Sequence, residues 1–440
     1  MLTEIVSNLS NLFRQDLFCV GNGMERKELP MKRYCIVGTG GRGTWMYADM
    51  LKKHFTDCAE LVGVYDINYK RCQKLIDATG WENCVIYHDF DEMIAKAKPD
   101  VVIVTTVDAF HHEYIVRALD LGCDVISEKP LTTDEVKYKA IVEAEKRNNK
   151  KVTVTFNLRF MPFFARIKSL LKNEDLLGDI LSVHYEWYLD TNHGAEYFRR
   201  WHRYRKNSGS LLIHKSTHHF DIANWFLEQD PVAVNAFGTR RFYGPTREQR
   251  SERCLTCPYK KTCEFYEDIT VEGTELKNLY YDCEDVDGYY RDRCVFADDI
   301  DIEDSVSVNV KYSGGTVMSY SLTAHSPFEG FRLVLNGKKG RLVAEHLCGV
   351  GYYKGKDIYN LTFYNRFGEK IDYNQPIGSA EGHGGGDIRL LEMIIRGGLE
   401  DPLGQVADSR AGAMSIMIGI AANHSMAEGK QIQIADLMDE

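Results

Sequence analysis

A glycine-rich turn constrains this chain more than any other feature of its sequence. An apolar run at residues 33–38 leads directly into the sequence GTGGRG at residues 38–43, and helical spacing follows at residues 42–54. This G-x-G-x-x-G pattern between a strand and a helix is typical of a turn that binds the pyrophosphate of a dinucleotide, because a Cβ atom would obstruct the turn or the approach of the phosphates. The predicted cofactor contacts in this turn are Gly38, Gly40, Gly41, Arg42 and Gly43.

An acidic residue follows at the end of the next apolar run. Asp66 stands where a carboxylate can accept hydrogen bonds from the ribose hydroxyls and repel a 2′-phosphate, which favours NAD over NADP. Lys70 and Arg71 lie nearby and leave NADP open as the cofactor. The alternative interpretation is structural: an ordinary turn between strand and helix, with Asp66 at the start of the helix that begins near Asn68.

The hydrophobic pattern divides the chain into regions. Short β-rich runs alternate with helical segments up to about residue 150, which indicates a parallel sheet with right-handed crossovers. Alternating strands then dominate, and helical spacing returns at residues 386–397 and 407–428, which indicates a mostly antiparallel sheet with helices on one face. We therefore expect an α/β chain with a mobile N-terminal extension (1–30), a Rossmann NAD(P)-binding domain (31–155), and an α+β substrate-binding and oligomerisation domain with an open sheet (156–440) that carries a cysteine-rich insert at about 245–303.

Charge and hydropathy exclude several classes of partner. The 440 residues include 54 basic and 64 acidic ones, a net charge of −10, whereas a protein that binds a phosphate backbone normally has a basic surplus. No run approaches the roughly 18 to 20 apolar residues that span a bilayer, and the first residues lack the pattern of a signal peptide. We expect no nucleic-acid partner, no membrane partner and a cytoplasmic location, where isolated thiols such as Cys35, Cys72 and Cys123 stay reduced.

Four stretches together give the chain a family resemblance. They are the glycine turn, Ser127-Glu128-Lys129-Pro130-Leu131, residues 157–160 (NLRF) and residues 209–221 (GSLLIHKSTHHFD). With these motifs, residues 31 to about 430 resemble the Gfo/Idh/MocA family, which includes glucose-fructose oxidoreductase and inositol dehydrogenase. The resemblance implies an NAD(P)-dependent enzyme that oxidises or reduces one carbinol of a sugar, cyclitol or glycoside. It also implies that the open face of the second sheet holds the substrate and pairs subunits into a homo-oligomer.

The resemblance assigns roles to individual residues. The lysine of the family falls on Lys129 and its catalytic histidine on His218. This chain departs from the pattern at two positions, with His214 in place of an aspartate and Ser216 in place of a glycine, which leaves the substrate and the partner of the base undecided. Further predicted cofactor contacts are Glu128 and Lys129 in the second stretch, and Thr106 and His111 in residues 106–111 (TVDAFH), which precede it.

The chemistry of hydride transfer requires the same residue types. Oxidation of a carbinol leaves an alcohol proton, so a base with a pKa near neutrality must lie within hydrogen-bond reach of that oxygen. We predict that His218 is this base and acid, and that Lys129 orients the hydroxyl by its charge. Residues 209–221 are predicted to form one helix, and His214 lies four residues before His218, one turn away on the same face, so both could point at the same substrate. His214 is a second contact to the substrate, half of a metal-binding pair with His383 as a third ligand, or an ordinary core histidine.

Sugars also require hydrogen-bond forks and stacking faces. Arg159 and Asn157 can bind hydroxyl or acidic groups, and Trp201 in the run at residues 199–203 offers an aromatic face. His383 lies in a glycine-rich loop and suits either a polar lid or a surface turn. The predicted substrate-binding residues are Asn157, Arg159, Trp201, Lys215 and His383.

A cysteine-rich insert lies between two predicted strands of the second domain. It contains Cys254-x-x-Cys257, then Cys263, Cys283 and Cys294, in a polar stretch with little apolar material for a core of its own. C-x-x-C spacing presents two thiolates to one tetrahedral ion. We predict a structural zinc site formed by Cys254, Cys257, Cys263 and Cys294, with Cys283 as the substitute fourth ligand; an iron-sulfur cluster, disulfides or free thiols are the alternatives.

Three functions remain open from the sequence. The first is an NAD(P)-dependent oxidoreductase that acts on CH–OH groups of a carbohydrate-type small molecule. The second is a glycoside-cleaving enzyme in which tightly bound NAD carries out a transient oxidation that permits elimination. The third is a nucleotide-binding scaffold without catalysis, in which a base and a lysine placed in this order would be idle.

Overall fold

The computed structural model describes residues 30–349, 351–374 and 382–439, and Lys32–Glu440 forms one compact unit. Except for Pro30, the predicted N-terminal extension lies outside the described residues.

The first region is built on a seven-stranded sheet with the order β15-β6-β5-β4-β1-β2-β3. Neighbouring strands among β1 to β6 are all parallel. β15, which comes from a distant part of the chain, pairs antiparallel with β6 at the edge of the sheet. β1, with the sequence KRYCIV, is buried over its last four residues, as expected for a strand covered on both faces. The strands are β1 (Lys32–Val37), β2 (Ala59–Tyr65), β3 (Val85–Tyr87), β4 (Val101–Val104), β5 (Asp124–Ser127), β6 (Val152–Val154) and β15 (Ala407–Asp408).

Helices connect these strands, and local capping fixes where several of them begin. Asp89 and Asp134 accept hydrogen bonds from backbone N–H groups in the first turns of α4 and α6, so each side chain satisfies a donor that the helix itself cannot. The helices of this region are η1 (Arg42–Asp49), α2 (Met50–His54), α3 (Tyr69–Thr79), α4 (Phe90–Ala97), η2 (Asp108–Phe110), α5 (His111–Asp120) and α6 (Glu135–Asn148).

The second region is built on a nine-stranded sheet with the order β14-β13-β12-β11-β7-β10-β9-β8-β16. All neighbours are antiparallel except β7 and β10, which are parallel, and burial alternates along β10 so that one face points to the core. The predicted fold class is thereby confirmed. The strands are β7 (Ile180–Asp190), β8 (Pro231–Thr239), β9 (Ser305–Tyr312), β10 (Val317–Ser326), β11 (Glu329–Gly337), β12 (Gly340–Cys348), β13 (Asp357–Asn365), β14 (Lys370–Asp372) and β16 (Ile432–Gln433).

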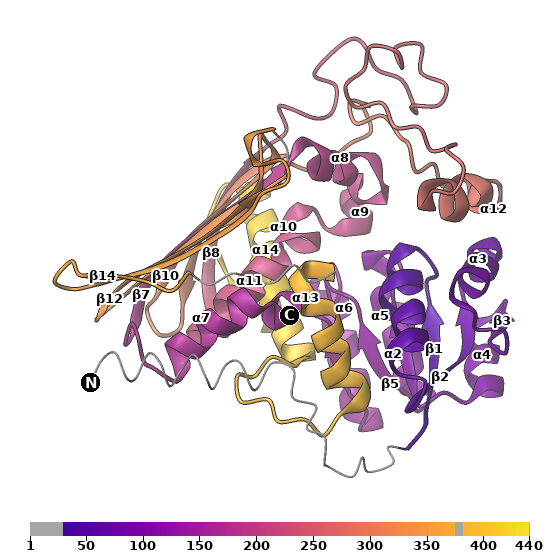
Figure 1. Cartoon of the computed structure of the whole chain (residues 1–440), viewed down its shortest axis with the longest axis horizontal. Coiled ribbons are helices and arrows are strands. Elements are labelled where there is room, and N and C mark those ends of the chain that lie inside the picture. Colours follow the sequence, from indigo (N-terminus) through magenta and orange to yellow (C-terminus); the bar gives the residue numbers. More distant parts are fainter. Residues whose placement is uncertain (1–29, 350, 375–381, 440) are drawn as a thin grey trace. The chain divides into compact units, whose positions relative to one another are not determined.

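Helices gather on one side of this second sheet, where Figure 1 shows α7, α11 and α14. No helix in the described ranges is both long and apolar enough to cross a membrane. The helices from residue 157 onward are η3 (Asn157–Phe160), α7 (Pro162–Lys172), α8 (Thr191–Arg199), η4 (Trp201–Arg203), α9 (Arg205–Ser208), α10 (Leu211–His214), α11 (Ser216–Leu227), η5 (Leu276–Tyr280), η6 (Tyr281–Cys283), α12 (Glu284–Asp287), η7 (Gly351–Tyr353), α13 (Gly382–Leu391), η8 (Glu392–Arg396), α14 (Ser409–Glu428) and α15 (Ile434–Asp439).

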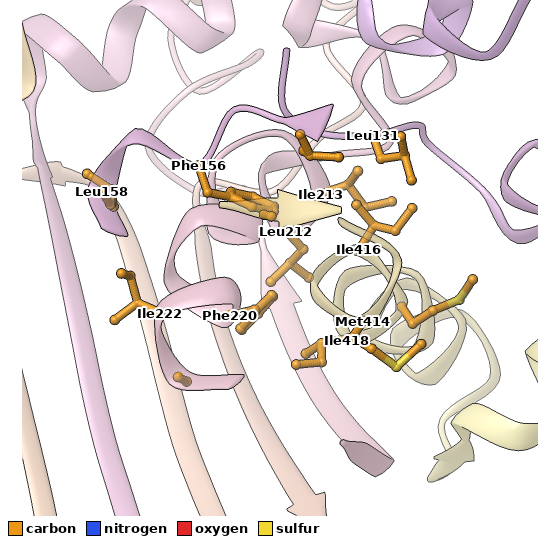
Figure 2. Packing of buried hydrophobic residues seen from close by; sticks show 14 of the residues in the cluster. Leu131, Phe156, Leu158, Leu212, Ile213, Phe220, Ile222, Met414, Ile416 and Ile418 are labelled. Carbon is orange, nitrogen blue, oxygen red and sulfur yellow. The ribbon is translucent and has the colours of Figure 1, made fainter. Parts of the chain in front are cut away.

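A continuous hydrophobic core joins the two regions. Leu131 and Phe156, which follow strands of the first sheet, share one buried cluster with Leu212 of α10 and Ile416 of α14 (Figure 2). Burying each such side chain contributes about 1.5 to 3 kcal/mol, so this cluster holds the carboxyl ends of the first sheet against α10 and α11. Those are the elements that carry the predicted catalytic residues.

The helix predicted over residues 209–221 is divided in two. α10 ends at His214 and α11 begins at Ser216. In a continuous helix the carbonyl of His214 would accept the N–H of His218, but it accepts the ammonium of Lys129 instead, while His218 N–H donates to the carbonyl of Lys215. The premise that His214 and His218 share one continuous helical face was therefore wrong.

Candidate active site

The glycine turn has the geometry of a phosphate cradle. Gly38 has a φ of 91°, and a Cβ atom on it would lie 2.7 Å from the carbonyl carbon of Thr105. A Cβ atom on Gly43 would lie 2.3 Å from the carbonyl oxygen of Gly38. Larger residues at these positions would displace backbone, so the glycines let the turn lie close to β4, as the turn of a dinucleotide site requires.

Asp66 follows β2 and holds the same turn from the other side. Its carboxylate accepts hydrogen bonds from the N–H groups of Thr39 and Asn68, each at 2.7 Å. Asp66 therefore has a structural role, because it holds the backbone of the glycine turn and of the segment that precedes α3. A ribose contact through Asp66 stays a prediction.

Glu128 and Arg42 form an ion pair behind the turn. The Arg42 guanidinium donates to Glu128 Oε1 at 2.7 Å, and the Tyr47 hydroxyl donates to the same oxygen at 2.9 Å. Arg42 also lies 3.6 Å from Asp387 of α13. Both predicted cofactor contacts are thus engaged in a network that ties the glycine turn to β5 and to a late helix.

Lys129 reaches from the end of β5 to the second region. Its ammonium donates to the carbonyl oxygen of His214 at 3.0 Å. Burial, assisted by the charges of Lys215 and Arg42, lowers the pKa of Lys129 to about 8, although Asp108 and Glu128 act in the opposite direction. A lysine in this state can both give and take a proton near neutral pH.

His214 and Asp108 form a buried pair beside this lysine. His214 Nδ1 lies 2.6 Å from Asp108 Oδ2, and only 3% of the Asp108 side chain is exposed. Burial raises the pKa of Asp108, and burial together with the charges of Lys129 and His202 lowers the pKa of His214, so each group shifts toward its uncharged form. Asp108 was not among the site residues predicted from the sequence; its place four residues after the end of β4, at the edge where the parallel strands end together, was the signal.

Aromatic rings enclose His214 on the other side. The ring of His202 lies 4.1 Å from that of His214, and Trp201 stacks on His202 with 3.7 Å between ring centroids. Lys215 lies over the ring of Trp187, 5.3 Å from its centroid, on the face of the second sheet that the helices cover. The structure thus brings Lys129, His214, Trp201 and Lys215 together at the boundary of the two regions.

His218 lies one turn into α11 and is buried. Its ring contacts that of Phe156 edge-on, with 6.0 Å between centroids. Phe156 follows β6, so His218 of the second region contacts the first region. The three catalytic assignments, Lys129, His218 and His214, stay predictions.

Other predicted site residues make internal contacts. Arg159 forms a two-pronged ion pair with Asp221 at 2.6 and 2.8 Å, and the Asn157 amide donates to Asp387 at 2.7 Å. The ring nitrogens of His111 lie 2.8 Å from the Pro130 carbonyl and 3.1 Å from that of Thr106. These contacts position the loops around the site. His383 belongs to α13, but its side chain is outside the part of the chain that the structure describes.

The cysteines of the insert line one small cavity. Cys254 and Cys294 lie on two paired segments, where Cys254 N–H donates to Asp292 and Cys294 N–H donates to Glu252, and a turn links Cys257 to Cys254. The cavity between them is lined by Cys254, Cys257, Cys263 and Cys294. Among the described residues, however, the group with three ligand atoms within 4.8 Å of one another is His346, Cys348 and Asp357, not these cysteines.

Comparisons with known proteins agree with this architecture. Residues 32–156 match a family model described as "Oxidoreductase family, NAD-binding Rossmann fold", and residues 168–434 match its "C-terminal alpha/beta domain". A protein of Bacillus subtilis (strain 168) named YteT is 36% identical over 92% of this chain and 99% of its own length. Inositol 2-dehydrogenase 1 of Paenarthrobacter aurescens is 26% identical over 50% of this chain and 60% of its own.

Solved structures with low sequence identity share the fold. The scyllo-inositol dehydrogenase of Lactobacillus casei superposes with a TM-score of 0.61 at 18% identity, over 92% of this chain and 99% of that one. The WlbA dehydrogenase of Bordetella pertussis gives 0.62 at 18% identity, over 92% and 98%. On the two domain matches and the glycine turn, the chain belongs to the Gfo/Idh/MocA family of oxidoreductases.

Proposed function

We propose that this protein is an NAD-dependent dehydrogenase that acts on a CH–OH group of a sugar, cyclitol or glycoside. The observation that carries the proposal is the buried cluster of Lys129, Asp108 and His214, where a lysine with a lowered pKa meets a carboxyl-imidazole pair at the carboxyl ends of the first sheet. Such a cluster is typical of a site that moves protons. The inositol dehydrogenases among the relatives and structural neighbours support the substrate class.

The position of each residue in the site suggests its role in the reaction. The bound nicotinamide supplies the hydride acceptor or donor. Lys129 holds the substrate oxygen by charge and shares its proton, and His218 faces the same boundary as the base and acid. His214 stands as the contact to a second hydroxyl, oriented through Nδ1 by Asp108. Trp201 and Lys215 border the substrate on the side of the second region.

A panel of sugars, cyclitols and glycosides tests the reaction. With NAD present, we expect at least one compound to produce NADH in proportion to its oxidised product. If no compound produces NADH but a glycoside releases its aglycone without net cofactor turnover, the enzyme is the glycoside-cleaving alternative. That second candidate is favoured by one observation: the hydroxyl of Tyr280 in the insert lies against the glycine turn, where it can help to retain the cofactor.

We also propose a structural zinc ion in the insert, held by Cys254, Cys257, Cys263 and Cys294. Their common cavity supports the proposal, and binding of the ion would draw the four thiolates together. Metal analysis of the purified protein tests it: about one equivalent of zinc is expected, and less than half an equivalent of any transition metal contradicts it.

A homo-oligomer formed through the uncovered face of the second sheet completes the proposal. Phe237 and Val317 are exposed and follow the outward positions of β8 and β10, which supports contact with another copy. Sedimentation of the wild-type protein and of a Phe237→Glu variant tests it, since the charged side chain is expected to shift the protein toward monomer.

A further inference from the structure

We propose that residues 275–287 of the cysteine-rich insert form the outer wall of the dinucleotide site and make it select NAD against NADP. The inference rests on the proposed NAD dependence and adds a part of the chain that lies more than two hundred residues after the glycine turn, as the separation of 239 residues between Gly41 and Tyr280 shows.

The first contact is with the glycine turn itself. The N–H of Gly41 donates to the hydroxyl of Tyr280 at 3.2 Å, and Glu275 Oε1 lies 2.6 Å from where a Cβ atom on Gly41 would stand. The backbone N–H groups of this turn are the ones expected to receive the pyrophosphate. The insert therefore reaches the phosphate end of the site.

Further contacts are with the segment that follows Asp66. The Asn68 side-chain amide donates to the carbonyl of Cys283 at 2.8 Å. Two helix residues beyond it form ion pairs with α12: Lys70 lies 2.7 Å from Asp285, and Arg71 pairs with Asp287. α12 is drawn close to α3 in Figure 1.

These ion pairs determine whether a basic group is free to bind the 2′-phosphate of NADP. A 2′-phosphate needs a basic group near the acidic residue that ends the second strand, and Arg71, 3.9 Å from Asp66, is in that position. Asp287 engages this guanidinium, and Asp285 engages the ammonium of Lys70. The two bases that left NADP open in the sequence are thus paired by the insert.

The two ion pairs differ in how much of each is exposed to solvent. The side chains of Arg71 and Asp287 are 11% and 12% exposed, whereas those of Lys70 and Asp285 are 36% and 66% exposed. An exposed pair contributes little, since water and salt screen it, while a mostly buried pair holds its partner firmly. Asp287 is therefore the residue that determines the selectivity.

The test measures dissociation constants of NAD and NADP by calorimetry at fixed ionic strength, without turnover. Asp287→Asn is expected to tighten NADP binding about 10-fold, because it frees a guanidinium for a charge-assisted hydrogen bond to the 2′-phosphate. Asp285→Asn is expected to change it about 2-fold or less. NAD binding is expected to stay within about 2-fold for both. Asp298→Asn, which loses an exposed ion pair with Arg250 elsewhere in the insert, serves as the matched control.

A second variant separates charge release from a loosened fold. In Arg71→Met/Asp287→Asn the gain in NADP affinity is expected to disappear, because it requires the guanidinium. Unchanged NADP binding in Asp287→Asn, or a gain that survives in the double variant, overturns the proposal. The binding constants are measured without a substrate. If no compound of the substrate panel reacts, the proposed reaction is contradicted, but the binding measurement still tests the selectivity.

Discussion

The two ends of the dinucleotide site are built in opposite ways. At one end Asp108 and His214 are buried and Lys129 is half-buried, and their contacts join the first sheet to the second region. At the other end Lys70 and Arg71 form ion pairs with carboxylates of the insert, and the pair of Lys70 is exposed whereas that of Arg71 is mostly buried. Burial shifts the pKa of every member of the first cluster toward the uncharged form. In the second, the hydrogen bond to Asp285 raises the pKa of Lys70, and the charges of Asp66 and Asp287 raise that of Arg71 against the effect of burial, so both groups stay charged.

The difference teaches how one fold separates chemistry from selection. Proton transfer requires groups whose charge changes near neutral pH, and only desolvation moves a lysine that far. Selection between NAD and NADP requires a fixed charge, which the ion pairs of Lys70 and Arg71 supply because paired groups stay charged near neutral pH. We expect substitutions at the first end to change turnover and those at the second to change affinity.

The largest effect is expected from Lys129→Met. Loss of the ammonium removes the group that holds the substrate oxygen, so kcat should fall by about 10² to 10⁴-fold. NAD affinity should change little. Steady-state rates on the best substrate of the panel, together with NAD titration, check this, and Lys96→Met, which removes an exposed lysine of α4, is the control. A kcat within a few-fold of wild type would mean that the buried cluster is not the catalytic end.

Asp108→Asn is expected to have the next largest effect. The amide keeps the shape but cannot hold His214 in the same protonation state, so kcat should fall about 10 to 100-fold. Asp91→Asn, which removes an exposed carboxylate paired with Arg117, is the control. If the two variants behave alike, Asp108 has no role in positioning His214.

The pH profile distinguishes lysine from histidine. Because burial lowers the pKa of Lys129 to about 8, the ammonium that holds the substrate oxygen is lost above that pH, so the rate of substrate oxidation should fall as the pH increases through about 8. The charge of Asp108 raises the pKa of Lys129, so the midpoint should move to lower pH in Asp108→Asn. If the profile shows only a midpoint near 6.5 that the substitution leaves in place, a histidine alone limits the rate and the charge of Lys129 has no part in it.

The smallest effect is expected from the distant zinc site. Chelation or Cys257→Ser should loosen the insert and weaken NAD binding only a few-fold, because the glycine turn itself stays intact. Thermal unfolding should show an early transition for the insert alone. If NAD affinity and the unfolding profile are both unchanged after complete metal removal, the insert does not depend on a metal for its contact with the cofactor site.

Local pattern was enough for much of the fold. The alternation of apolar runs and helices predicted the parallel sheet. Alternating hydrophobicity predicted strands at residues 180–189, 232–240, 304–312, 315–323, 331–336 and 340–346, and these overlap β7 to β12 with ends that differ by at most three residues. β3 was missed because a three-residue edge strand carries almost no periodic signal, and β13 because its sequence, DIYNLTFYN, is rich in polar residues.

The sequence by itself determined the glycine turn, Asp66 and the position of Lys129, because these depend on strand ends and spacing along the chain. Only the tertiary structure decided that Asp108 is the partner of His214, that Lys129 interrupts the helix after His214, and that Asp285 and Asp287 pair with Lys70 and Arg71. These contacts join residues 85 to 216 positions apart. No local pattern encodes such pairs, since they form only when the common core brings the two regions together.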